Sequence, residues 1–239
     1  MSVGSGPVIP NFGSGSSCEQ QNNAFCWGWV QKHWSDTLQP ALIQHIELTA
    51  IALLVGFAIA FCLALLTLGY RRAEQPIGIA AALLYTIPSL ALYQLLVPLT
   101  GLTTATIEIA LVTYTLVLLY PNIVAGFRAA PADTIEAAYG MGLTRRQVFT
   151  RVELPLALPS ILAGVRIATV STITVATIAA TISELGLGYP IFYALGLQPA
   201  PFKTEIYAAG FLVVALALIC DALLVGTRRL LTPWQRAAK

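Results

Sequence analysis

Five long apolar stretches, almost free of charge, are the feature that most limits how this chain can fold. They cover residues 46–70, 77–98, 106–120, 160–182 and 206–226. A helix needs about 20 such residues to cross a bilayer, and helices and closed barrels are the structures that satisfy their backbone there. Only 10% of the 239 residues are charged, against about 25% in soluble domains. We therefore expect an all-α integral membrane protein, a five-span helical bundle.

The segments before and after the spans have their own character. Residues 1–24 begin with a Gly/Ser-rich stretch and lack the basic and apolar regions of a secretory signal peptide, which predicts a flexible segment. Residues 25–44 show apolar side chains at helical spacing, namely Trp27, Val30, Trp34 and Leu38. This pattern predicts an amphipathic helix at the water–lipid interface, with packing on the protein itself as the alternative. Residues 227–239 are a polar tail.

The positive charges predict the orientation of the chain. With the N-terminus outside, eleven of the thirteen Lys and Arg residues lie on the cytoplasmic side, and only Lys32 and Lys203 lie outside. The eleven are Arg71, Arg72, Arg128, Arg145, Arg146, Arg151, Arg166, Arg228, Arg229, Arg236 and Lys239. This asymmetry is what the positive-inside rule requires, so we expect a multi-pass cell-membrane protein with a cytoplasmic C-terminus. Cys18 and Cys26 would then face an oxidising compartment, where they either pair or stay free.

The loop between the third and fourth spans, residues 122–156, is the longest polar stretch between spans. Asp133 is expected to cap a short helix, with Glu136 three residues later as in a capping box. Gly142 is expected to end this helix, because glycine adopts the left-handed turn after a helix at low cost.

A second short helix is expected directly after this glycine. Thr144 and Gln147 again have the spacing of a capping box. Leu154-Pro155 is expected to end the helix, since a residue before proline is disfavoured in the helical region. By itself, the pattern fits a plain connector as well as a functional element.

This loop resembles the EAA loop of ABC-importer permeases. The pattern is Glu-Ala-Ala, three residues, Gly, nine residues, Ile, one residue and Leu-Pro, which here corresponds to Glu136, Ala137, Ala138, Gly142, Val152, Leu154 and Pro155. The one departure is Val152 in place of isoleucine. The resemblance implies that the loop, including Asp133, Arg145 and Arg146, docks on a separate ATP-binding subunit.

The resemblance extends over residues 45–226 and is strongest to the osmoprotectant group of these permeases. The phrases that carry it are Gln44-His45-Ile46, residues 86–92 and Glu184-Leu185-Gly186. It implies half of a type I importer channel, with a second identical or paralogous permease, ATP-binding subunits and an extracytoplasmic binding protein. The solute would be of the glycine betaine, choline, carnitine or proline type. The alternatives are another small solute such as an amino acid, or a non-transporting membrane anchor for an ATPase.

Five residues are candidates for the solute pathway or its gate. Pro88, followed by Ser89, interrupts the second span and predicts either a hinge or a static kink. Thr169 and Thr172 belong to a span rich in small and hydroxylated residues, which suits either an aqueous wall or tight helix packing. Glu184 follows that span, in an apolar stretch broken by Gly and Pro.

Nothing in the sequence predicts catalysis. A phosphate-binding GxxxxGK[ST] loop is absent from the sequence, and its two histidines have no metal-ligand spacing. We expect a transport subunit with no cofactor of its own, ATP on a partner subunit, contact with membrane lipid and no nucleic acid. Asp221 lies inside the last span, where it is expected either to pair with an arginine at the same helix end or to act in transport.

Overall fold

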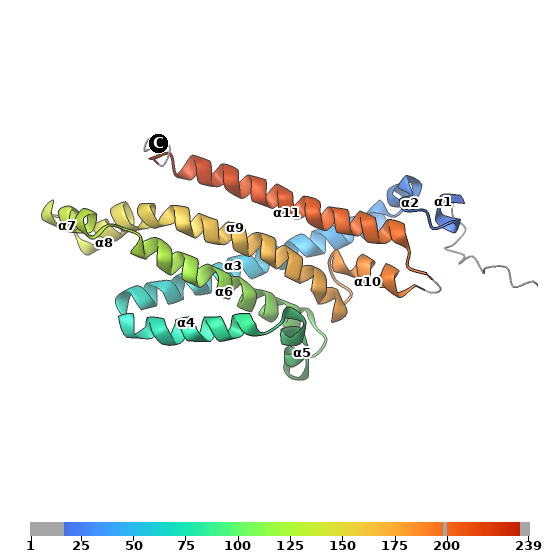
Figure 1. Ribbon diagram of the computed structural model, residues 1–239, viewed down its shortest axis with the longest axis horizontal. Helices are drawn as coiled ribbons and strands as arrows, with labels where there is room; N and C mark the ends of the chain where they lie inside the picture. The colour runs from blue at the N-terminus through green and yellow to red at the C-terminus, as the bar shows by residue number, and fades with distance from the viewer. Residues whose placement is uncertain (1–16, 198–199, 235–239) are drawn as a thin grey trace, which may run out of the picture.

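The computed structural model describes residues 17–197 and 200–234, and these residues form helices joined by short turns (Figure 1). The α-helices are α1 (Ser17–Gln20), α2 (Trp27–Lys32), α3 (Gln39–Gly69), α4 (Arg71–Thr86), α5 (Ser89–Thr100), α6 (Thr104–Arg128), α7 (Ala132–Gly140), α8 (Arg145–Val148), α9 (Leu154–Ile178), α10 (Gly188–Gly196) and α11 (Lys203–Leu231). Two π-helical segments, Trp34–Leu38 and Phe149–Glu153, and one 3-10 turn, Ala179–Thr181, complete the set. Most of the expected flexible segment, as well as Arg236 and Lys239, lies outside the described residues.

Helices α3, α6 and α9 form the centre of the bundle, and small residues let them approach closely. A Cβ atom added at Gly56 of α3 would lie 2.7 Å from Thr115 of α6, and one at Gly164 of α9 would lie 2.6 Å from Asn122. Such contacts are typical of membrane helices, where association depends on close packing. Helix α6 thus packs against both α3 and α9, and it also contacts α4.

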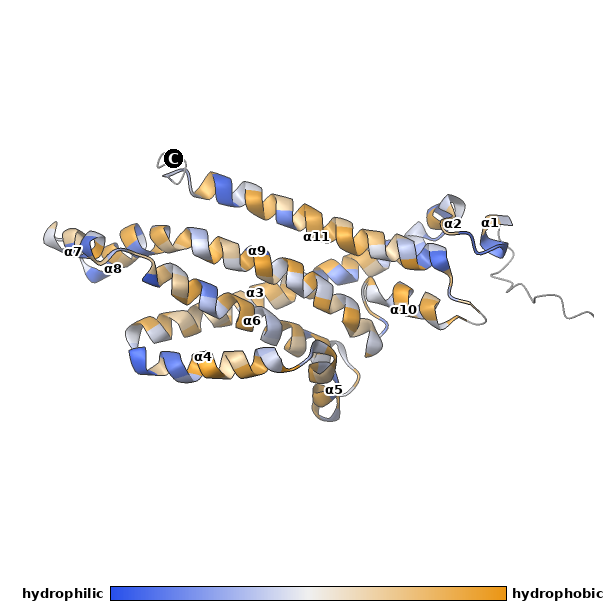
Figure 2. Ribbon diagram, viewed as in Figure 1, coloured by the Kyte–Doolittle hydropathy of each residue, from blue (hydrophilic) through white to orange (hydrophobic). Residues whose placement is uncertain are grey.

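Four helical stretches of the described residues are long and apolar enough to cross a membrane: Trp34–Gly69, Thr104–Arg128, Arg145–Thr181 and Lys203–Leu231. A bent pair, α4 and α5, would make a fifth. Figure 2 shows the long helices apolar along their middles, with hydrophilic residues gathered near several of their ends. The all-α fold, with four to five apolar helices, is therefore confirmed.

The expected second span, residues 77–98, is not one helix. Helices α4 and α5 meet at an angle of 100°. Ile87 has an extended backbone, with φ −73° and ψ 120°, because Pro88 follows it and caps α5. The Tyr114 hydroxyl donates a hydrogen bond to the Ile87 carbonyl, so this break is satisfied from α6.

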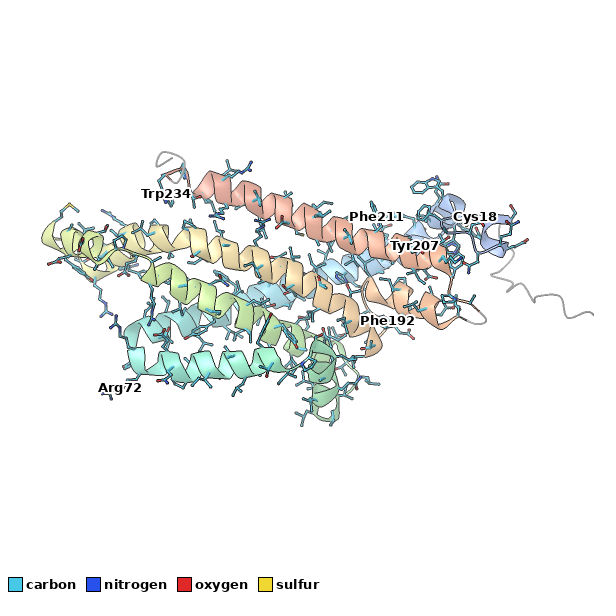
Figure 3. All side chains as sticks on the ribbon, in the orientation of Figure 1. Cys18, Arg72, Phe192, Tyr207, Phe211 and Trp234 are labelled. Atoms are coloured by element: carbon cyan, nitrogen blue, oxygen red, sulfur yellow. A yellow bond between two sulfur atoms is a disulfide. The ribbon has the colours of Figure 1, made fainter. Side chains whose placement is uncertain are left out.

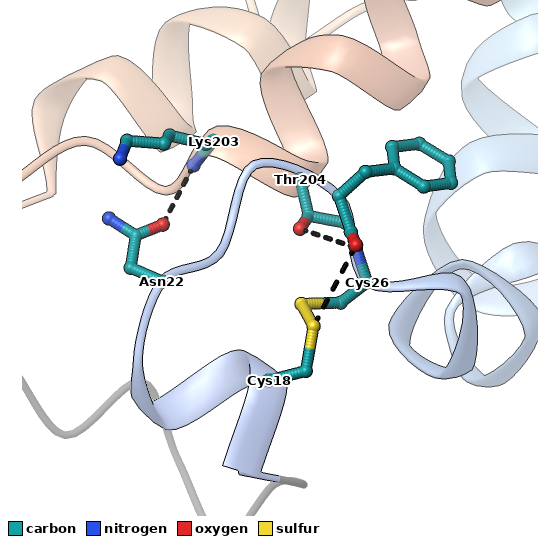
Figure 4. Close-up of a disulfide and its surroundings, with 6 residues drawn as sticks. Cys18, Asn22, Cys26, Lys203 and Thr204 are labelled. Atoms are coloured by element: carbon teal, nitrogen blue, oxygen red, sulfur yellow. Dashed lines mark hydrogen bonds between the residues drawn. A yellow bond between two sulfur atoms is a disulfide. The ribbon is translucent and has the colours of Figure 1, made fainter.

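The N-terminal described residues fold back onto the end of the bundle formed by α10 and α11. Cys18 and Cys26 form a disulfide, which decides the alternative that the sequence left open (Figure 4). Asn22 accepts a hydrogen bond from the Lys203 backbone at 3.1 Å, and the Thr204 hydroxyl accepts one from the Cys26 backbone at 3.0 Å.

Residues 25–44 do not form one amphipathic helix. They are divided among α2, the π-helical segment Trp34–Leu38 and the start of α3. Of the four residues expected on one face, Val30 and Leu38 are buried, whereas Trp27 and Trp34 are exposed. The change of helix type between α2 and α3 breaks the register that the spacing assumed.

Candidate functional site

Helix α7 projects from one end of the molecule and ends in a tight left-handed turn (Figure 1). Gly142 has φ +82°, the Gly142 N–H donates to the Tyr139 carbonyl, and the Leu143 N–H donates to the Ala138 carbonyl. This pair of bonds defines a Schellman motif, and its glycine position favours a residue without a Cβ. The expected role of Gly142 in ending the helix is thus confirmed.

The start of α7 differs from the expectation. Pro131 occupies the N-cap position and Asp133 lies inside the first turn, without a side-chain cap. The prediction that Asp133 caps this helix is therefore wrong, because α7 begins at Ala132 and Asp133 is its second residue. Asp133 still faces the positive end of the helix dipole, where a carboxylate is favourable.

The surface of α7 is exposed apart from Ala138 and the half-buried Ile135. Ala138 is 1% exposed and holds the helix against its neighbours, whereas Glu136 and Ala137 are exposed. The adjoining Tyr139 and Met141 are 47% and 74% exposed. Large exposed apolar side chains beside small ones, on a projecting helix, are typical of a surface that another protein covers.

Helix α8 has the expected N-terminus and an unexpected C-terminus. Thr144 and Gln147 form the predicted capping box. The helix does not stop at Leu154-Pro155, because the chain stays helical from Arg145 to Thr181 through the π-helical segment Phe149–Glu153. Pro155 stands in the first turn of α9, where a missing N–H is tolerated. Helices α8 and α9 are therefore parts of one continuous helical stretch.

An aromatic chain anchors this helical junction to the bundle. Phe149 stacks on Phe127 of α6, with ring centroids 5.5 Å apart, and Phe127 contacts Phe61 of α3 at 6.2 Å. Beside it, a pocket of about 830 Å³ is lined by Leu65, Leu68, Gly69, Phe127, Tyr139, Arg145, Arg146, Phe149 and Glu153. Phe127 and Phe149 were missed from the sequence, since their contact joins segments on either side of α7 and no local spacing signals it. Val152 and Leu154, both half-buried, lie in the same helical junction.

The pathway candidates do not lie together. Pro88 and Ser89 form the elbow between α4 and α5. Thr169 and Thr172 are buried, and the Thr172 hydroxyl lies 3.0 Å from that of Thr115 on α6. Both threonines therefore pack inside this subunit. Glu184 is exposed and follows α9. The burial of the neighbouring Tyr189 phenol raises its pKa above the ordinary value, and the negative charge of Glu184 raises it further.

Two of the segments that carry the resemblance to osmoprotectant permeases, Gln44-His45-Ile46 and Glu184-Leu185-Gly186, are in contact in the structure. His45 is fully buried; its Nδ1 accepts the Leu187 N–H at 3.2 Å, and its Nε2 lies 3.1 Å from the Ile173 carbonyl. Since Nδ1 accepts, Nε2 carries the proton and donates it. Gln44 accepts the Gly186 N–H at 3.2 Å. The start of α3 thus fixes the turn after α9.

Asp221 of α11 has a partner, but not at its own helix end. Its carboxylate accepts a hydrogen bond at 2.8 Å from Arg166 Nη2 on α9 and a second from Nε of the same residue. This two-pronged ion pair links α9 to α11. The pairing was expected, whereas the identity of the arginine required the arrangement of the helices.

The sequence of this chain matches a known protein family and several characterised relatives. The model of a family described as "Binding-protein-dependent transport system inner membrane component" matches residues 52–234. The choline transport system permease protein OpuBB of Bacillus subtilis (strain 168) is 32% identical over 191 residues, 80% of this chain and 86% of that protein. The carnitine transport permease protein OpuCB of Listeria monocytogenes is 34% identical over 192 residues, again 80% and 86%.

A solved structure has the same fold. An inward-facing structure of the MetNI methionine ABC transporter superposes with a TM-score of 0.71 at 18% identity, covering 82% of this chain and 99% of that one. At this identity the match shows the fold of the bundle alone. The 35 described residues before the family match, 17–51, include the disulfide and most of the N-terminal packing.

Proposed function

This chain belongs to the inner membrane components of binding-protein-dependent transport systems, the permeases of ABC importers, and we propose that it forms half of the membrane pathway for a small osmoprotectant. It is a transport subunit, and ATP is bound and hydrolysed by partner subunits. The observation that carries the proposal is the exposed helix α7, which the Gly142 turn joins to α8, and α8 is in turn continuous with the α9 span.

In this proposal, α7 and α8 are the docking element for an ATP-binding subunit. Glu136 and Ala137 would lie at the contact, with Tyr139 and Met141 supplying apolar area that water leaves on binding. Arg145 and Arg146 would complete the charged rim. Because α8 runs into α9 without a break, movement of the ATP-binding subunits would rotate α9 as a rigid element.

The solute is proposed to be a small osmoprotectant of the glycine betaine, choline, carnitine or proline type. The support comes from what the relatives named above transport and from the phrases around His45 and Gly186. An extracytoplasmic binding protein would deliver the solute, and a second permease, identical or paralogous, would complete the pathway.

The N-terminus is proposed to lie outside and α7 in the cytoplasm. The distribution of arginines supports this orientation, and so does the Cys18–Cys26 disulfide, which persists in an oxidising compartment. Gly140 of α7 tolerates a Cβ, since no atom lies within 4 Å of that position. A Gly140→Cys thiol should therefore react with an impermeant reagent from the cytoplasmic side only.

Transport by the purified complex tests the proposal. The permease is reconstituted in liposomes with its ATP-binding subunits and binding protein, and uptake of labelled glycine betaine, choline, carnitine, proline and methionine is measured with and without ATP. We expect ATP-dependent accumulation of at least one quaternary ammonium solute. Accumulation of methionine alone would contradict the solute class, and no accumulation of any solute would favour the non-transporting anchor.

A further inference from the structure

The ion pair between Arg166 of α9 and Asp221 of α11 lies within the membrane and not at its surface. Asp221 is seven residues before Arg228 on α11, which is about 10 Å along the helix axis. Arg228 and Arg229 are the basic residues of the last turn of this helix, where cationic side chains reach the lipid headgroups. The pair therefore lies at the depth of the lipid chains, in the half of the membrane next to α7.

Asp221 satisfies only part of the Arg166 guanidinium. Its carboxylate accepts hydrogen bonds from Nε and Nη2 of Arg166, whereas the arginine side chain carries five N–H donors. The other three donors have no partner among the described residues, and the Arg166 side chain is 46% exposed. Lipid chains offer no acceptors, so donors exposed to them are unfavourable. The surroundings of Arg166 therefore have to supply oxygen atoms.

The exposed face of α9 is also polar elsewhere. Thr174 is exposed on α9, and Thr181 is exposed in the turn that follows. The Thr174 hydroxyl donates to the Val170 carbonyl at 3.0 Å, and its lone pairs remain available to further donors. Ile167 lies seven residues before Thr174, two helical turns away, and so shares its face. This face combines a charged group with hydroxyl groups over several turns of the helix.

The exposed faces of α3 and α11 have a different character. From Ile51 to Leu68 of α3, and from Tyr207 to Leu223 of α11, every exposed residue is aliphatic, aromatic or cysteine. Tyr207 and Phe211, which are 54% and 71% exposed, lie on the first half of α11 (Figure 3). Large apolar side chains of this kind favour contact with lipid. The exposed face of α9 is thus less suited to lipid than those of its neighbours.

We propose that the exposed face of α9, from Arg166 to Thr174, is a wall of the water-filled route that the solute takes, and that water on this route hydrates the free N–H donors of Arg166. The inference rests on the proposed function and adds the surface along which the solute moves. Thr169 and Thr172, on the buried side of the same helix, pack against its neighbours and do not line the route. Asp221 holds the guanidinium beside α11 and keeps it out of the centre of the route.

Two isoleucines at the depth of the ion pair provide a matched comparison. Ile167 follows Arg166 and is 49% exposed, whereas Ile219 is two residues before Asp221 and is 58% exposed. At about 100° per residue, Ile219 lies about 200° around α11 from Asp221, on the far side of the helix. The proposal places Ile167 in contact with water and Ile219 in contact with lipid.

The first test measures whether water reaches these two positions. Ile167→Cys and Ile219→Cys are made in a chain whose free cysteines, Cys62 and Cys220, are replaced by alanine. The complete complex, in lipid nanodiscs, is treated with a water-soluble cationic methanethiosulfonate with and without ATP, and labelling is followed by the mass of the chain. The reagent attacks a thiolate, which forms in water and not among lipid chains. We expect Ile167→Cys to react at least tenfold faster than Ile219→Cys.

The outcomes separate the wall from the proposed function. Equal rates for the two cysteines, whether slow or fast, would overturn the wall. Fast labelling of Ile167→Cys alone supports it even in a complex that transports no osmoprotectant, a result that would contradict the proposed solute class and not the wall.

The second test narrows the route. ATP-dependent uptake of a solute that the wild type transports is measured in liposomes for Ile167→Trp and Ile219→Trp, two identical substitutions of exposed residues. We expect Ile167→Trp to reduce uptake about tenfold or more by steric exclusion, with normal abundance and normal subunit content, and Ile219→Trp to remain within twofold of wild type. Unchanged uptake by Ile167→Trp would overturn the proposal. So would loss of the second permease from its complex, which would identify this face as an interface between permeases.

Discussion

The two ends of the molecule are built in opposite ways (Figure 1). At the end with α10, the Cys18–Cys26 disulfide and the hydrogen bonds of the buried His45 hold segments of the chain together. Gly186 and Gly188 are packed so closely there that an added Cβ atom would lie within 3.0 Å of a neighbouring atom. At the other end, α7 buries Ala138, half-buries Ile135 and presents its remaining residues to the surroundings. The structure of the α10 end is thus determined by contacts within this chain. The other keeps its shape through a local turn and offers a surface that a partner can complete.

If the α10 end is tightly packed, Gly188→Ala should have the largest effect on stability. A Cβ at Gly188 would lie 2.0 Å from the Thr177 carbonyl oxygen, a backbone atom that cannot move aside alone. We expect a loss of about 3 kcal/mol or more, because overpacking against a rigid neighbour forces a backbone shift. Thermal unfolding of the purified protein in detergent measures it. Gly196→Ala, on the same helix but with no atom within 4 Å, is the control, and equal stability of the two variants would refute this view.

His45→Leu should be the next most damaging change. It removes the acceptor of the Leu187 N–H and the donor to the Ile173 carbonyl and leaves both groups buried. Each unsatisfied group costs about 1–3 kcal/mol, so we expect a loss of about 2 kcal/mol after relaxation. Hydrogen exchange at the Leu187 amide should accelerate at the same time. Exchange as slow as in wild type would show that His45 does not fix this turn.

At Gly142, in the turn after α7, a substitution tests the backbone conformation alone and not the available space. A Cβ there meets no atom within 4 Å, so a substitution acts only through φ +82°. Gly142→Val should cost about 1–2 kcal/mol, whereas Gly142→Asn, which tolerates the left-handed region, should cost less. We expect the valine variant to lose co-purifying ATP-binding subunit and the asparagine variant to retain most of it. Equal retention by both variants would mean that the turn geometry does not matter for docking.

Local patterns in the sequence predicted local structure well. Four of the five apolar runs predicted helices long enough to cross a membrane, because a helix satisfies its backbone polar groups within its own segment. The Thr144–Gln147 capping box and the Gly142 turn were predicted for the same reason, since their partners lie within a few residues. The disulfide was one of two open alternatives, because sequence does not determine whether cysteines pair.

Features that depend on distant contacts were not predicted. The break at Pro88 was expected as a kink, but its angle of 100° depends on how α5 packs on α6. The helix was expected to stop at Leu154-Pro155, yet the π-helical segment before Pro155 and the stacking of Phe149 on Phe127 carry it onward. Asp221 was expected to find an arginine on its own helix and instead meets Arg166. In each case the deciding partner lies on another segment of the chain.

Co-purification of the ATP-binding subunit tests most directly whether the α7 end is its docking surface. The permease carries a C-terminal tag, and the amount of ATP-binding subunit retained in mild detergent is compared for wild type, Glu136→Lys and Asp36→Lys. Both acids are exposed and change by the same charge, but Asp36 belongs to the segment Trp34–Leu38 that follows α2, and α2 lies at the opposite end of the molecule from α7. Both variants should unfold within about 0.5 kcal/mol of wild type, as exposed substitutions usually do. We predict that Glu136→Lys loses the subunit and Asp36→Lys keeps it, whereas full retention by Glu136→Lys would contradict the account.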